Sequence, residues 1–132
     1  MAVSTTLDFQ KEVQKLFDLF DNLEIDKLKD MFSDDAQGVD EISRQWLRGK
    51  DAMNGYFAQL AEMGISDIHS DLSDVEVKQW DDVALVTCIA DQTYKVGGDQ
   101  VTIKAPGSFL FRRNNGSWRL ELVHAVPLPD AD

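Results

Sequence analysis

Residues 83–126 read VALVTCIADQTYKVGGDQVTIKAPGSFLFRRNNGSWRLELVHAV, and this stretch decides the fold. Apolar and polar side chains alternate along it with the two-residue period of half-buried β-strands. Two turn sequences divide it, Gly97-Gly98-Asp99 and Asn114-Asn115-Gly116, and the second is a strong hairpin signal. We therefore predict antiparallel strands over 83–96, 100–113 and 117–126, with the middle strand interrupted at Pro106-Gly107.

The two-residue period begins upstream of this stretch, after Gly64. The apolar residues there fall on two parities, since Ile68 and Leu72, with Ser70 between them, share one and Val75 and Val77 share the other. A β-bulge near Ser73-Asp74 would keep them all on one face of the sheet, so we predict a bent strand.

Residues before Gly64 follow helical spacing instead. Apolar side chains recur every three or four positions over 7–23, again over 25–32, and again from Met53 to Leu60. Polar residues Ser33-Asp34-Asp35 end the second helix, and 36–42 is weakly patterned. Three N-terminal helices followed by a meandering sheet predict a single α+β domain over 1–132, with the helices on one face.

Composition narrows the classes of function. The 132 residues carry 13 basic and 24 acidic side chains, a net charge of −11, which disfavours nucleic acid as a partner. One cysteine cannot form an intrachain disulfide, and one cysteine with two histidines cannot supply the four ligands of a structural zinc site. Nothing in the sequence has the length or flanks of a membrane span or a signal peptide, so we expect a cytoplasmic protein, from a bacterium.

Three segments, taken in order, resemble one family. They are DKLKDMFSDDA at 26–36, LRGKDAM at 47–53, and the closing strand with Trp118, His124 and Pro127. Together they resemble the SnoaL-like group of the nuclear transport factor two-like, or ketosteroid isomerase-like, superfamily. The resemblance implies a cystatin-like cone, in which a strongly curved antiparallel or mixed sheet wraps around three helices, and a homodimer. Isomerases, dehydratases, cyclases and non-catalytic assembly modules share this fold, so the site must decide the function.

The resemblance places a catalytic residue at Asp40. The segment DDAQGVD at 34–40 is similar to the ketosteroid isomerase stretch that ends in the general base, and Asp40 falls on that aspartate. Such a carboxylate moves a proton next to a carbonyl, and ketosteroid isomerase is a standard example of this tuning. The alternative is a surface carboxylate on a strand edge beside Glu41. Because Gly38 permits a bulge, the face that Asp40 occupies stays open.

The partners that ketosteroid isomerase uses to stabilise the enolate oxygen are absent. Along the same resemblance, the oxyanion tyrosine falls on Leu16 and the protonated aspartate on Gly107 or Ser108. Losing such donors costs on the order of 10²-fold in rate. True ketosteroid isomerase activity is therefore not expected, although Tyr56, Tyr94 or Ser108 offer a donor from another direction.

His124 is the second catalytic candidate. Strict alternation places it with Trp118, Leu120 and Leu122 on the covered face of the last strand. In that position it would be the acid that complements Asp40. The alternative is a histidine of the core or of a dimer interface, with both ring nitrogens satisfied.

Four further residues are candidates for contact with a ligand. We expect Trp46, Tyr56, Tyr94 and Ser108 to contact a ligand, against the alternative that these aromatics only fill the core. No histidine or carboxylate spacing matches a metal site, and no nucleotide motif is present, so neither metal nor cofactor is expected. The leading hypothesis is a small-molecule-binding protein, with isomerase, cyclase or dehydratase chemistry by proton transfer on an oxygenated apolar substrate. The alternative is a non-catalytic homo-oligomeric scaffold or protein-interaction module.

Overall fold

A computed structural model describes residues 8–40 and 43–127 of the chain. Its elements follow the order that the sequence predicts, with two additional strands, and their bounds are α1 (Phe9–Asp21), α2 (Ile25–Lys29), β1 (Phe32–Val39), β2 (Leu47–Arg48), α3 (Lys50–Glu62), β3 (Ser66–Trp80), β4 (Val83–Val96), β5 (Asp99–Asn114) and β6 (Ser117–Ala125).

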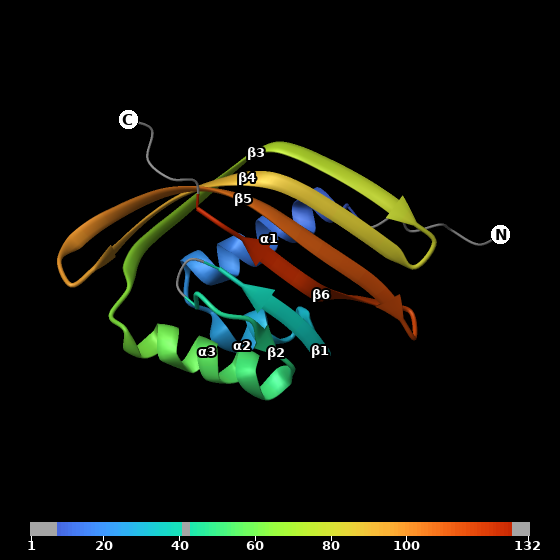
Figure 1. Ribbon diagram of the computed structural model, residues 1–132, viewed down its shortest axis with the longest axis horizontal. Coiled ribbons are helices and arrows are strands. Elements are labelled where there is room, and N and C mark those ends of the chain that lie inside the picture. The colour runs from blue at the N-terminus through green and yellow to red at the C-terminus, as the bar shows by residue number, and fades with distance from the viewer. Residues whose placement is uncertain (1–7, 41–42, 128–132) are drawn as a thin grey trace.

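These strands form a curved mixed sheet in the order β2-β1-β6-β5-β4-β3. The neighbours in this order pair antiparallel, except β1 and β6, which pair parallel. Figure 1 shows the long strands arching over α1, while α2 and α3 lie at the end of the sheet formed by β1 and β2. The structure therefore confirms the α+β fold with helices packed on one face of a strongly curved sheet.

The core lies between α1, α3 and the concave face of the sheet. Val13 of α1, Leu60 of α3 and Val86 of β4 are each no more than 1% exposed. Each helix contributes a stripe at helical spacing, and each strand contributes alternate residues, as the sequence predicts. Removing this apolar surface from water supplies the main stabilising free energy.

Strand β3 contains the predicted bulge. Its pairing with β4 shifts between Ser73 and Glu76, and Asp74 between them adopts a φ of +51°. The bulge lets Leu72 and Val75, which have opposite parities, both pack against the core. The prediction is confirmed, because burial of one face fixes the register on either side.

Two sequence predictions about the strands are wrong. Phe32 begins β1 rather than ending a helix, because its buried side chain faces the core beside Phe57 while Asp34 and Asp35 face water. Strand β5 also continues through Pro106-Gly107, which pair with Ile89 and Cys88 of β4. Glycine at 107 gives the Phe109 ring room, because an added Cβ would lie 3.1 Å from that ring.

Candidate functional site

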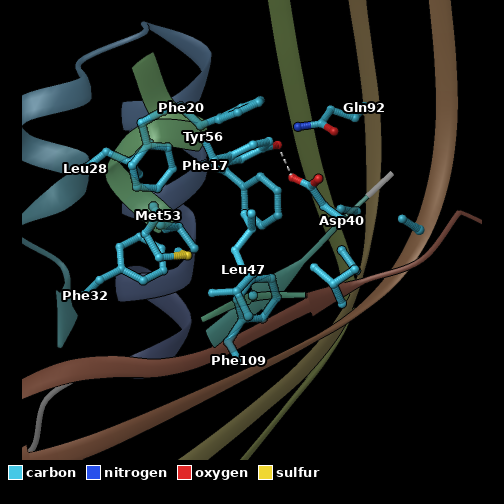
Figure 2. A pocket seen from close by; sticks show the side chains of 18 residues that line it. Phe17, Phe20, Leu28, Phe32, Asp40, Leu47, Met53, Tyr56, Gln92 and Phe109 are labelled. Atoms are coloured by element: carbon cyan, nitrogen blue, oxygen red, sulfur yellow. Dashed lines mark hydrogen bonds between the residues drawn. The ribbon is translucent and has the colours of Figure 1, made fainter. Parts of the chain in front are cut away.

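An apolar cavity of about 90 Å³ lies between the helices and the concave face of the sheet. Figure 2 shows the side chains that line it, with the aromatic rings of the helices on one side and the strands on the other. Its lining residues come from α1, α2, α3 and five strands, and they are Leu16, Phe17, Phe20, Leu28, Phe32, Gly38, Val39, Asp40, Leu47, Met53, Tyr56, Phe57, Ala90, Gln92, Ala105, Phe109, Val123 and Ala125.

Small side chains on the sheet create this space. Ala90 of β4 pairs directly with Ala105 of β5, and both point to the helices. Gly38 of β1 and Ala125 of β6 line the cavity from the neighbouring strands. Since protein interiors otherwise pack to crystal-like density, four small residues at adjoining inward positions leave a hollow that the aromatic rings of α1 and α3 do not fill.

Asp40 occupies the polar end of the cavity. It follows β1 directly, and its carboxylate is held from two sides. The Ser43 backbone N–H donates to Oδ1 at 2.8 Å, and the Tyr56 hydroxyl donates to Oδ2 at 2.5 Å. These bonds fix the orientation of the carboxylate, as Figure 2 shows for the bond from Tyr56. The question of which face Asp40 occupies is thus answered: it faces the cavity.

Three hydrogen-bonded polar side chains, Gln92, Ser70 and Asp21, lead from the cavity lining to the end of α1. Ser70 of β3 donates to the Asp21 carboxylate through both its backbone N–H, at 3.0 Å, and its hydroxyl, at 2.7 Å. The Gln92 side-chain amide donates to Ser70 Oγ at 3.0 Å. Burial raises the pKa of Asp21 above its ordinary value of 3.8, and the hydrogen bonds from Ser70 oppose that rise.

Substituting Ser70 with alanine should destabilise the protein increasingly as the pH rises. The folded-state pKa of Asp21 lies above the unfolded value, so its stabilising contribution is full below pH 3.8 and is lost as pH rises through the folded pKa. Removing the hydroxyl donor raises that pKa further, which adds about 1 kcal/mol to the loss at pH 7. Urea denaturation of both proteins at pH 4 and pH 7 measures this. A difference between them that is the same at both pH values would contradict the account.

His124 does not face the cavity, which corrects its predicted orientation. The pairing of β6 with β5 shifts between Leu110 and Phe111, because Glu121 is an extra residue between their partners Leu120 and Leu122. This bulge reverses the parity, so Val123 and Ala125 point into the cavity and His124 points to the outer face of the sheet. The sequence contains no glycine or turn residue at this position that signals the bulge.

Two other predicted ligand contacts lie with His124 on the outer face. The Trp46 ring stacks on the His124 ring at 6.1 Å between centroids, and the Arg48 guanidinium covers the Trp46 ring at 5.5 Å. Ser108 pairs with His124 across the strands and alternates with Gly107 and Phe109, which face inward. Trp46, Ser108 and His124 therefore do not reach the Asp40 cavity.

The two tyrosines differ in position. Tyr56 lines the cavity and contacts Asp40, as described above. Tyr94 is buried in the core on the inward face of β4 and is not among the residues that line the cavity. The sequence reasoning missed Gln92, Ser70 and Asp21. The available signal was Gln92 itself, a polar side chain at an inward position between Ala90 and Tyr94.

The described part of the chain was also searched for a metal site, a membrane-spanning helix and a reactive thiol. No three His, Cys, Asp or Glu side chains there gather into a metal site, and no helix there has the length and hydropathy to cross a membrane. Burial raises the pKa of Cys88 to about 11. A thiol with this pKa is protonated at neutral pH, so Cys88 packs as a small apolar side chain.

Residues 11–128 match the model of the SnoaL-like domain, and the chain belongs to this family. The fold is also similar to that of solved structures. An NTF2-like protein with a cystatin-like fold from Novosphingobium aromaticivorans has a TM-score of 0.72 and 16% identity over 93% of this chain and 81% of that one.

Two further similar structures carry different descriptions. A ketosteroid isomerase-like protein from Erwinia carotovora atroseptica has a TM-score of 0.78 and 18% identity over 92% of this chain and 94% of that one. The CamKII hub homology domain of Chlamydamonas reinhardtii has a TM-score of 0.76 and 17% identity over 96% of this chain and 100% of that one. At these identities the likeness shows the fold alone. A search of curated proteins finds no match.

Proposed function

We propose that this protein binds a small, largely apolar molecule in the Asp40 cavity. The observation that carries the proposal is the Asp40 carboxylate, fixed by Ser43 and Tyr56, at one end of a cavity whose described lining is mostly apolar. Ligand sites are typically of this kind, apolar with a few placed polar groups. A volume of about 90 Å³ limits the ligand to at most about one ring, since an apolar cavity of about 150 Å³ holds benzene.

The proposed chemistry is proton transfer with Asp40 as the general base. A general base must reach its proton within hydrogen-bond distance, and among the described residues Asp40 supplies the carboxylate that lines the cavity. Leu16 lines the same cavity with an alkyl side chain, and Gly107 and Ser108 supply no donor to it. An enolate oxygen would therefore lack the donors that ketosteroid isomerase has at these positions, which argues against ketosteroid isomerase activity. The volume argues equally against a steroid-sized substrate.

A second candidate function is assembly with copies of the same chain, and the outer face of the sheet favours it. Leu85, Leu110 and Leu122 lie there, half-buried, beside Ser108 and His124. Apolar side chains on a free sheet face favour burial against a partner. The similar structure of a hub homology domain fits this role, and we propose a homodimer that uses this face. This assembly is compatible with a ligand in the cavity, because the two faces of the sheet are distinct.

Native mass spectrometry of the gently purified protein tests the binding proposal. We expect a multiple of the chain mass that retains a small organic molecule. The Asp40→Asn variant should lower the retained fraction at least tenfold, because a hydrogen bond to a charged group contributes about 1.5–3 kcal/mol. Asp91→Asn, an exposed position on β4, is the matched control. Equal retention by the wild type and by Asp40→Asn would contradict the proposal, and an oligomer without any adduct would favour the assembly role.

A further inference from the structure

A second space, which we call the outer hollow, adjoins the Asp40 cavity. Its volume is about 340 Å³, against about 90 Å³ for the cavity. Its described lining comes from the segment after β1, from β2 and from one face of α3, and comprises Ser43, Gln45, Leu47, Ala52, Tyr56 and Gln59. Leu47 and Tyr56 line the cavity as well, so these two side chains, both labelled in Figure 2, form the partition between the two spaces.

The boundary between the two spaces lies at Asp40. Its carboxylate lines the cavity, whereas Ser43 and Tyr56, which donate hydrogen bonds to that carboxylate, line the outer hollow. The Ser43 hydroxyl also accepts from the Asp40 backbone N–H at 3.1 Å and donates to the Gln45 backbone carbonyl at 3.1 Å. The residues that orient the candidate base therefore also order the rim of the outer hollow.

The outer hollow offers hydrogen bonds without charge. Gln45 and Gln59 are exposed, and each side-chain amide carries donors and an acceptor. No charged side chain belongs to the described lining, although 28% of the residues in the chain are charged. A charged ligand group would thus gain no ion pair from this lining. A neutral group that both donates and accepts, such as a carboxamide, complements the two glutamines.

The size of the cavity requires a second site for any polar group on its ligand. A space of about 90 Å³ takes at most about one ring, so a group attached to that ring must lie outside. Leu47 is the part of the partition that can give way. It is half-buried on β2, a two-residue strand at the edge of the sheet, whereas Tyr56 is tied to Asp40 by its hydroxyl.

We propose that the ligand spans both spaces, with an apolar ring in the Asp40 cavity and a neutral hydrogen-bonding group of the carboxamide kind in the outer hollow. This inference rests on the proposed function and adds a second subsite to it. The linker passes Leu47 beside Asp40. The Asp40 carboxylate takes no part in holding the polar group, so it keeps its proposed role as the general base. Gln59 is then a specificity-determining residue.

Matched probes test this proposal by protein-detected NMR titration in physiological salt, with benzene as the reference. The probes are propylbenzene, phenylbutyramide, phenylbutyrate and phenylbutylammonium, which share a ring and a linker and differ in the terminal group. We expect phenylbutyramide to bind at least threefold more tightly than each of the others, with shifts at Ala90 in the cavity and at Gln59 in the outer hollow. Equal or tighter binding of another probe, or shifts confined to one of the two spaces, would overturn the inference.

A variant of the outer hollow separates its role from that of the cavity. Gln59→Leu keeps the approximate size of an exposed side chain and loses the amide, so it should lower phenylbutyramide affinity at least threefold and leave benzene affinity unchanged. Gln100→Leu, exposed on β5, makes the same change elsewhere and should alter neither. If Gln59→Leu keeps the preference for phenylbutyramide over propylbenzene, the assignment of Gln59 is wrong. If benzene binds and phenylbutyramide gains nothing over propylbenzene, the inference fails and the cavity proposal stands; if neither benzene nor any probe binds, both fail.

Discussion

Substitution of Phe109 with alanine is expected to lower the free energy of unfolding by about 3–5 kcal/mol, the range for large aromatic side chains removed from a core. Phe109 is 1% exposed, and its ring packs edge-to-face on Phe17 with centroids 5.7 Å apart. It also covers Gly107, whose missing side chain leaves room for the ring. Because Phe109 borders an existing cavity, its removal enlarges that cavity, and collapse around it recovers little of the loss.

Chemical denaturation of the wild type and of Phe109→Ala measures this difference. Leu110→Ala is the neighbouring control, because Leu110 points to the outer face and is only half-buried. We expect its effect to be less than half that of Phe109→Ala. A loss below about 1 kcal/mol for Phe109→Ala would mean that the packing of α1 on β5 is not as described.

Much of this fold follows from local patterns in the sequence. The strands over 83–96 and 117–125 are delimited by turn residues, and the bulge in β3 follows from a change of parity between Leu72 and Val75. The sequence pattern does not predict strand β1, for a physical reason. Its pairing is parallel to β6, a long-range contact, and its exposed Asp34 and Asp35 have the composition of a helix end.

The site was less predictable than the fold. The sequence predicts both Asp40 and Tyr56 as site residues, and the structure brings them together at the cavity. Strict alternation places His124 on the wrong face, because a bulge at Glu121 has no local sequence signal. Gln92 was overlooked because its partners, Ser70 and Asp21, lie on elements distant in sequence. Side-chain orientation across strands thus depends on register, which local periodicity does not fix when a bulge intervenes.

Filling the cavity should abolish binding of any ligand to it. Ala105 is 2% exposed and points into the cavity, so Ala105→Leu adds three heavy atoms to a space of about 90 Å³. The added side chain occupies the volume that a one-ring ligand needs, and we expect no detectable binding. Ala90→Leu, on the paired position of β4, should act in the same way. Ala58→Leu makes the same change on the exposed face of α3 and should leave binding unaltered.

The most direct test of the central claim is an NMR titration of benzene into the wild type, Ala105→Leu and Ala58→Leu, with folding of each checked from the spectrum before the ligand is added. Benzene needs only the apolar cavity and none of its polar groups. The account predicts saturable shifts at Ala90, Met53 and Phe109 in the wild type and in Ala58→Leu, and none in folded Ala105→Leu. The absence of binding to the wild type, or equal binding to Ala105→Leu, would contradict it.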